Sequence, residues 1–423
     1  MPGEKLSRIF FKPMRVILLV LDAVGVGEMP DVLLVRPQDK GANTLKRVMQ
    51  SAGHFGLTNL FQLGLGHIVA SREGSGAPIS SAWASYGISR LAHKGADSYL
   101  GHQEIMGTIP KPPETTLMRQ AADSLEQKLT GHGHFVRRPL AGKSLLLIDE
   151  AVIIGDNLEA DPGLNINLTV ATDLIGFEEA LRIGRIVRDA VCVSRVIVFG
   201  GPGIDISDIL RHVEQRENGQ IGVDSPSLGV YNDHLQVQHL GYGVDPERQA
   251  ASILSRKGIP VILIGKMADL IVCPGSIRDP VVPTQQVMEA VFRSYRDTRD
   301  AFIAATVQET DLAAHEGDLL RLAAVLAEVD RGLGLLLSEM TAEDVLIICA
   351  DHGNDPQLNV GLHTREETPL LIYQKGKRAI QLGTRDTLAD IGATIAHLFN
   401  APPTQDGSII AYGGTHEARD TNS

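Results

Sequence analysis

Uninterrupted runs of hydrophobic residues recur along the chain, and polar residues follow several of them directly. A run without alternating polar positions predicts a strand buried on both faces, as in a largely parallel sheet covered by helices. Helical periodicity lies between several runs, for example from Leu319 to Met340. Strands that alternate with helices predict a doubly wound α/β fold. The predicted strands are residues 16–21, 145–148, 196–199, 261–264, 301–307, 345–349 and 370–373.

The middle of the chain has a different character. It begins with Pro110-Lys111-Pro112-Pro113, is rich in proline, glycine and histidine, and has helix and strand signals of its own. A chain of 423 residues is also too long for one ordinary hydrophobic core. We therefore predict a core domain formed by residues 1–108 and 242–423. A smaller α/β cap domain, residues 109–241, is expected to be inserted into it.

Two predicted strands end in an aspartate. Asp22 follows the first run, and Asp351 and His352 follow the run at 345–350. In open α/β sheets, ligands bind in the crevice outside the carboxyl ends of the strands. Carboxylate oxygen together with imidazole nitrogen suits Mn²⁺ or Zn²⁺ better than Ca²⁺. Asp22 taken alone is equally consistent with the N-cap of a helix. The Asp351-His352 pair behind an apolar run favours a metal site.

Three further residues are candidate metal ligands. Asp311 and His315 lie at positions i and i+4, which places both side chains on one face of a helical turn. His363 follows on a predicted loop. The Asp-x-x-x-His spacing alone is also common on solvated helix faces. With the strand-end residues, however, these three complete a set large enough for two metal ions, and two-metal sites serve displacement reactions at phosphorus.

Ser98 is the candidate nucleophile. It lies in Ala96-Asp97-Ser98-Tyr99, a segment that could begin a helix whose free backbone N–H groups favour a phosphate. A serine hydroxyl is a weak nucleophile unless a metal ion or a base activates it. Simple helix capping is the alternative interpretation of Ser98.

Composition narrows the class of protein. The net charge of -12 and the aromatic content of 4% argue against binding to nucleic acid. Cys192, Cys273 and Cys349 are widely spaced without a CxxC pair, which predicts a reduced, cytoplasmic protein. The first apolar run is short and ends at Asp22, so we expect a buried strand rather than a signal peptide or a membrane span. No oligomeric state is predicted.

Several segments resemble the phosphopentomutase family of the alkaline-phosphatase-like metalloenzyme superfamily. They are LDAVGVGEMPD at 21–31, GLG at 64–66, GHQEIMG at 101–107, ADHGNDP at 350–356, HTRE at 363–366 and TLADIGAT at 387–394. The resemblance covers roughly residues 16–107 and 260–410, and it is thin through the predicted insertion.

The resemblance implies a two-metal phosphomutase with a phosphoserine intermediate. Its substrate would be a small sugar phosphate, with phosphate moving between the 1- and 5-positions of ribose or deoxyribose. Two Mn²⁺ ions are expected, with Zn²⁺ or Mg²⁺ as alternatives. By position, one ion would be held by Asp22, Asp351 and His352 and the other by Asp311, His315 and His363, with Ser98 between them.

Five other residues receive expected roles near the substrate. Arg195 matches a family arginine of the cap that holds the substrate. Lys266 and Asn354 could contact phosphate oxygens. Glu104 could orient His102 beside the site, as an acidic partner often orients a histidine.

The chain departs from the family at several positions. Ser98 stands where the family usually has threonine, and Gln103 replaces a tryptophan. The segment around His315 reads AHEGD rather than GHRRD, and its Asp-to-His spacing is closer to that of cofactor-independent phosphoglycerate mutase, which also uses serine. Three alternatives therefore stay open: a phosphomonoesterase, a mutase for another small phosphorylated substrate, and a non-catalytic relative.

Overall fold

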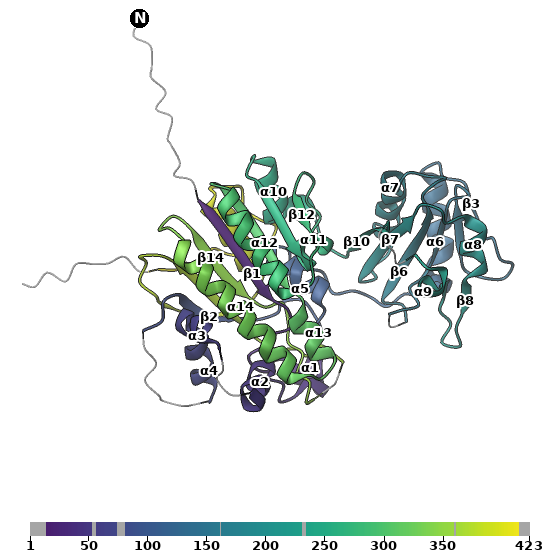
Figure 1. Cartoon of the computed structure of the whole chain (residues 1–423). Helices are drawn as coiled ribbons and strands as arrows, with labels where there is room; N and C mark the ends of the chain where they lie inside the picture. Colours follow the sequence, from purple (N-terminus) through teal and green to yellow (C-terminus); the bar gives the residue numbers. More distant parts are fainter. Residues whose placement is uncertain are drawn as a thin grey trace, which may run out of the picture. The chain divides into compact units, whose positions relative to one another are not determined.

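The computed structural model describes residues 14–52, 56–73, 81–160, 162–230, 234–358 and 361–413 (Figure 1). They form two compact units. The larger unit combines residues up to 109 with residues from 245 onward, and the smaller unit spans residues 110–244. The predicted insertion was 109–241.

Eight strands of the described residues form the main sheet of the larger unit, in the order β12-β11-β13-β1-β14-β15-β2-β16. Their bounds are β1 (Arg15–Leu21), β2 (Ser85–Ser89), β11 (Val261–Gly265), β12 (Ile277–Asp279), β13 (Ala301–Val307), β14 (Val345–Cys349), β15 (Thr368–Gln374) and β16 (Gln381–Arg385). Among these strands, β15 alone runs antiparallel to the others. The predicted largely parallel α/β sheet is confirmed.

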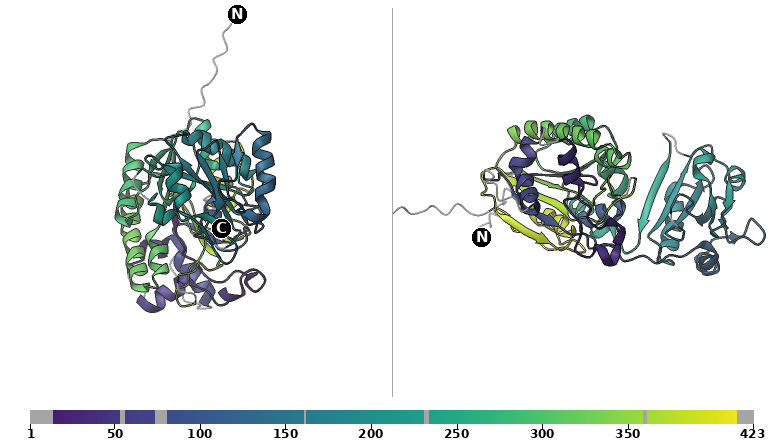
Figure 2. Two further views of the ribbon diagram at one scale, coloured as in Figure 1. Left: turned by 90° about the vertical axis from the view of Figure 1, so that its right-hand side faces the viewer. Right: turned by 90° about the horizontal axis from the view of Figure 1, so that it is seen from below.

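Helices cover both faces of this sheet, as the two views of Figure 2 show. On β1, Ile17, Leu19 and Leu21 pack with helices on one face, whereas the alternating residues between them pack with helices on the other. The first face is covered by α2 (Thr44–Ala52), α12 (Thr284–Asp297) and α14 (Leu319–Glu339). The second is covered by α10 (Ala250–Arg256), α11 (Lys266–Leu270) and α15 (Ala389–Leu398). Burial on both faces explains the uninterrupted hydrophobic runs.

The smaller unit has a sheet of its own. Within the described residues its order is β10-β7-β6-β5-β4-β3. The bounds are β3 (Val136–Arg137), β4 (Leu146–Ile148), β5 (Val152–Asp156), β6 (Asn165–Ala171), β7 (Arg195–Gly201) and β10 (Gln236–Gly241). Helices α6 (Met118–Gly131) and α7 (Phe177–Arg188) pack on it through a shared hydrophobic cluster. The remaining elements of this unit are α8 (Ile206–Arg211), β8 (Val213–Gln215), β9 (Ile221–Val223) and α9 (Ser225–Leu228).

Short helices connect the strands of the larger unit. They are α1 (Val32–Val35), η1 (Pro37–Asp39), α3 (Thr58–Leu60), η2 (Phe61–Leu65), α4 (Gly66–Glu73), α5 (Ser98–Ile105), η3 (Pro246–Arg248) and α13 (Glu309–His315). Among the described residues, no helix combines the length and the apolar character that a membrane crossing requires.

Register places the functional residues at one edge of the main sheet. Leu21, the last residue of β1, pairs with Val307 at the end of β13, and Val20 pairs with Cys349 at the end of β14. Asp22 and Asp351 therefore leave the sheet side by side, at the carboxyl edge where ligands bind in open α/β folds.

Candidate metal centre

Asp22, Asp351 and His352 form a fully buried cluster at the ends of β1 and β14. One potential ligand atom from each lies within 4.8 Å of the others. His352 Nε2 is 3.2 Å from Asp351 Oδ2 and 3.6 Å from Asp22 Oδ1. The backbone N–H of Ala23 donates to Asp351 Oδ1 at 3.1 Å, which ties the two strand ends together.

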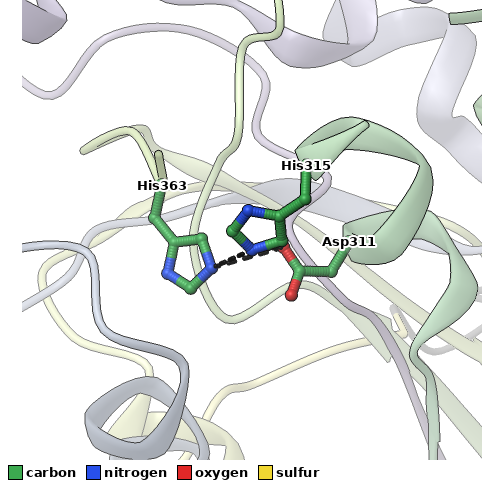
Figure 3. Close-up of side chains that lie close together, drawn as sticks. All are labelled: Asp311, His315 and His363. Carbon is green, nitrogen blue, oxygen red and sulfur yellow. Dashed lines mark hydrogen bonds and ion pairs between the residues drawn. The ribbon is translucent and has the colours of Figure 1, made fainter. Parts of the chain in front are cut away.

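A second cluster consists of Asp311, His315 and His363 (Figure 3). Asp311 and His315 lie one turn apart on α13, and the loop before β15 supplies His363. Asp311 Oδ1 is 3.3 Å from His315 Nε2 and 3.4 Å from His363 Nε2. This cluster is more open than the first, because the side chains of His315 and His363 are 35% and 24% exposed.

All three histidines are oriented by backbone carbonyls. Nδ1 of His352 lies 2.9 Å from the oxygen of Gly353, Nδ1 of His315 lies 3.0 Å from that of Gly361, and Nδ1 of His363 lies 2.8 Å from that of Ala96. A carbonyl oxygen only accepts, so each Nδ1 must carry the proton. Once its second proton is displaced, each Nε2 can direct its lone pair into its cluster, the arrangement that metal-binding histidines adopt.

Two observations indicate that the clusters suit cations. His352 Nε2 is buried and makes no hydrogen bond with any described residue. His315 Nε2 and His363 Nε2 lie only 2.9 Å apart, so two lone pairs would face each other without a proton or an ion between them. Carboxylate and imidazole donors in each cluster match a hard-to-borderline divalent ion such as Mn²⁺ or Zn²⁺.

Burial and neighbouring charges shift the pKa values of residues in both clusters. Burial alone would lower the pKa of His352, but the nearby charges of Asp351, Asp311 and Asp22 raise it to about 10. Burial, together with the charge of Asp351, raises the pKa of Asp22 to about 7. Burial opposes ionisation of Asp311, yet hydrogen bonds with His315 and His363 hold its pKa below the usual range. The site therefore stabilises positive charge.

Ser98 lies between the strand ends, in the first turn of α5. The helix is capped by Asp97, whose Oδ1 accepts from the N–H of Leu100 at 3.0 Å, so Ser98 is not the capping residue. Ser98 Oγ donates to Asp351 Oδ2 at 2.7 Å and lies 3.4 Å from Asp22 Oδ1. The helix approaches closely because Gly101 has no side chain: a Cβ there would lie 2.6 Å from the carbonyl oxygen of Asp351.

Lys266 and Asn354 both reach the acidic groups. Lys266 Nζ lies 2.6 Å from Asp22 Oδ2 and 3.4 Å from Asp311 Oδ2, so it bridges the two clusters. Asn354 Nδ2 donates to Asp311 Oδ1 at 3.3 Å. Burial would lower the pKa of Lys266, but Asp22, Asp311 and Asp351 raise it above its usual value, so the ammonium is charged.

The expected pairing of His102 with Glu104 is wrong. Residues two apart on a helix point to different faces. His102 Nδ1 lies 2.8 Å from the carbonyl oxygen of Ser98 and 3.1 Å from Asp351 Oδ2, so His102 contacts the first cluster itself. Glu104 instead contacts His93, whose Nδ1 lies 2.6 Å from Glu104 Oε2, and it also accepts from Thr387.

Sequence reasoning assigned no role to Glu366. This fully buried carboxylate accepts from Gly27 N at 3.2 Å, from Thr44 N at 3.0 Å, and from the hydroxyls of Thr44 and Thr364 at 2.7 Å each. Burial raises the pKa of Glu366 to about 7. Thr44 Oγ1 in turn accepts from the N–H of Asn354 at 2.9 Å. Glu366 thus connects the loops that carry both clusters. In the sequence it is only one charged residue near the start of a strand, and this pattern does not indicate such a role.

Arg195 is the first residue of β7 in the smaller unit. The two clusters, Ser98, Lys266 and Asn354 belong to the larger unit. The role of Arg195 in holding substrate therefore stays a prediction.

Comparison with known proteins identifies the superfamily. The sequence profile of the metalloenzyme superfamily matches residues 14–403, most of the chain. The chain belongs to the metalloenzyme superfamily.

Within it, the chain is similar to phosphopentomutases over nearly its whole length. The phosphopentomutase of Symbiobacterium thermophilum is 28% identical over 417 residues, which cover 94% of this chain and 98% of the relative. That of Caldanaerobacter subterraneus is 29% identical over 418 residues, 93% of this chain and 96% of the relative. A solved structure of Leishmania mexicana phosphoglycerate mutase is 14% identical with a TM-score of 0.47, covering 96% of this chain and 99% of its own. The resemblance seen in the short segments is confirmed.

Two of the departures from the family, Gln103 and Glu316, lie outside this metalloenzyme's two clusters. Gln103 is buried, donates to the carbonyl oxygen of Leu270 and accepts from Gln249, so it serves packing between helices. Glu316 is exposed and pairs with Arg321. Neither change removes a residue from the two clusters.

Proposed function

We propose that this metalloenzyme is a two-metal phosphomutase that carries phosphate on Ser98. The observation that supports this most is the position of the Ser98 hydroxyl. It lies in hydrogen-bond contact with Asp351 of one cluster, at the N-terminus of a helix, and Lys266 connects that cluster to the second. A hydroxyl in such a place can accept a phosphoryl group whose oxygens meet backbone N–H groups and cations.

The proposed ligands of one ion are Asp22, Asp351 and His352, and those of the other are Asp311, His315 and His363. Two divalent ions, of which we propose Mn²⁺, would supply Lewis-acid stabilisation of the charge on a transferring phosphoryl group. His102 can position Asp351, because its Nδ1 lies 3.1 Å from Asp351 Oδ2 while its Nε2 accepts a hydrogen bond from Thr306 Oγ1 at 2.9 Å.

The remaining chemistry is carried by the chain. Phospho-Ser98 transfers its phosphoryl group to a free hydroxyl of a bound sugar phosphate: the bond between phosphorus and the new sugar oxygen forms, and the bond to Ser98 Oγ breaks. The proton of the sugar hydroxyl ends on Ser98 Oγ, where Asp351 Oδ2 accepts the resulting hydrogen bond. The bisphosphate then returns its other phosphate to Ser98. Lys266 and Asn354 bind phosphate oxygens, and substrate enters from the side of the second cluster, whose two histidines are partly exposed.

The proposed substrate is ribose or deoxyribose phosphate, converted between its 1- and 5-phosphates. Support comes from the full-length similarity to phosphopentomutases, at 27–29% identity. The free thiols of Cys192, Cys273 and Cys349 are consistent with the reducing cytoplasm, where we place the enzyme.

A product assay tests the function. Mn²⁺-loaded enzyme, primed with a sugar bisphosphate, is incubated with ribose 1-phosphate, and ribose 5-phosphate and free phosphate are measured together. The proposal expects ribose 5-phosphate in large excess, and loss of both products in Ser98→Ala. Free phosphate as the main product would identify a phosphomonoesterase. Turnover of hexose or glycerate phosphates but not of pentose phosphates would identify a mutase for another substrate.

A further inference from the structure

A cavity lies in the larger unit, far from the metal clusters. Its volume is about 850 Å³, within the range of small-molecule sites. Tyr373 and Gln374, at the end of β15, line it. Gln374 pairs with Val345, the first residue of β14, whereas Asp351 follows the last residue of that strand. The length of chain between Val345 and Asp351 corresponds to about 20 Å at the rise of a β-strand.

Aromatic rings form one part of the cavity lining. Trp83, Tyr86, Tyr373 and His67 all line it. The rings of His67 and Tyr86 are stacked, with centroids 4.7 Å apart and planes inclined by 21°. Trp83 is the single tryptophan of the chain and is 46% exposed. An exposed tryptophan beside a stacked pair offers flat surfaces on which another ring can stack.

Two positively charged side chains form another part of the cavity lining. Lys377 and Arg378 line the cavity from the turn between β15 and β16. None of the described lining residues is an aspartate or a glutamate, although the chain carries a net charge of -12. Neither Lys377 nor Arg378 forms an ion pair with another described residue. The cations are therefore available to an anionic ligand, and arginine is well suited to bidentate contact with phosphate.

We propose that this cavity binds a nucleoside monophosphate, or a close chemical relative with one flat heteroaromatic ring and one phosphate, at a site separate from the metal centre. The ring stacks against Trp83 and Tyr86, and the phosphate contacts Lys377 and Arg378. The combination distinguishes this ligand from the ring-free sugar phosphate proposed for the metal centre.

The fluorescence of Trp83 gives a direct binding assay, because no other tryptophan contributes. The full-length protein is titrated with AMP, with adenosine, with ribose 5-phosphate and with inorganic phosphate, once with Mn²⁺ and once with a chelator. We expect a saturable change with AMP that is the same with and without metal. Adenosine and the two ring-free anions should bind at least about tenfold more weakly, because each lacks one half of the contacts.

Matched variants locate the site by calorimetry. Arg378→Gln and Lys377→Gln should each weaken AMP binding at least about tenfold, through loss of a charge-assisted contact. Lys375→Gln removes the same charge from the same turn, but Lys375 does not line the cavity and should leave the affinity unchanged. Each of three results would overturn the proposal: no saturable AMP binding, AMP binding abolished by the chelator, or equal affinity in Arg378→Gln and Lys375→Gln. If inorganic phosphate binds as tightly as AMP, the proposed stacking of the ligand ring on Trp83 and Tyr86 is wrong.

Discussion

Lys266 allows the metal sites to be tested through protein stability. Its side chain is 16% exposed, and its Nζ lies 2.6 Å from Asp22 Oδ2 and 3.4 Å from Asp311 Oδ2. In metal-free protein, Lys266→Met leaves these buried carboxylates without their ammonium partner. Removing one member of a buried ion pair costs about 3–5 kcal/mol, because the other charge stays buried and unpaired. Bound divalent ions would supply the missing positive charge, so the cost in Mn²⁺-loaded protein should fall below about 2 kcal/mol.

The assay is urea unfolding followed by the fluorescence of Trp83, which belongs to the same unit as the clusters. Wild type and Lys266→Met are compared in chelator and in Mn²⁺. Lys40→Met is the matched control: Lys40 pairs with Glu28 but is 58% exposed, so its removal should cost about 0–1 kcal/mol in both conditions. If Lys266→Met loses the same free energy of unfolding with and without Mn²⁺, Asp22 and Asp311 do not bind metal ions.

Three other predictions concern the same site. Asp351→Asn and His315→Gln should each reduce bound manganese from two ions per chain to about one, measured by elemental analysis of the purified protein; unchanged metal content would remove these ligands from the account. Glu366→Ala should lower the unfolding free energy by about 3–5 kcal/mol, because it leaves buried donors such as Thr44 N unpaired, whereas Glu366→Gln should cost about 2 kcal/mol or less in the same unfolding assay. A raised pKa stabilises the protonated form, so the metal-free protein should lose stability as the pH rises from 6.5 towards about 10, where His352 loses its proton. Over that range the affinity for Mn²⁺ should increase, because His352 must lose its proton to bind the ion. An affinity that calorimetry finds independent of pH would contradict the role of His352 as a metal ligand.

The sheet and the first cluster follow from sequence because both depend on local pattern. A continuous apolar run marks a strand buried on both faces, and its last residue marks the edge. Parallel register then brings Asp22 and Asp351 together without further information. Helical spacing likewise placed Asp311 and His315 on one face of α13.

Features built from several distant segments could not be predicted in this way. Glu366 accepts from residues near positions 27, 44 and 364, and nothing in any one segment indicates the network. The prediction that Glu104 orients His102 was wrong because closeness in sequence was taken for closeness in space. The residues that contact Glu104 precede α5 in the sequence, as His93 does, or follow it at a distance, as Leu388 does. The cavity beside Trp83 is likewise formed by residues of strands, helices and turns that lie far apart in the sequence. The predicted role of Arg195 in holding the substrate is supported by the resemblance to the family.

The central claim is that Ser98 carries the phosphoryl group, and peptide mass spectrometry tests it most directly. Mn²⁺-loaded protein is treated with ribose 1,5-bisphosphate and digested. The account predicts one phosphate on the peptide that contains Ser98, absent in Ser98→Ala and retained in Ser71→Ala, a control whose hydroxyl donates to the carbonyl oxygen of Ile68 within its own helix. Phosphate on another residue, or mutase turnover without a phosphorylated Ser98 peptide, would contradict it.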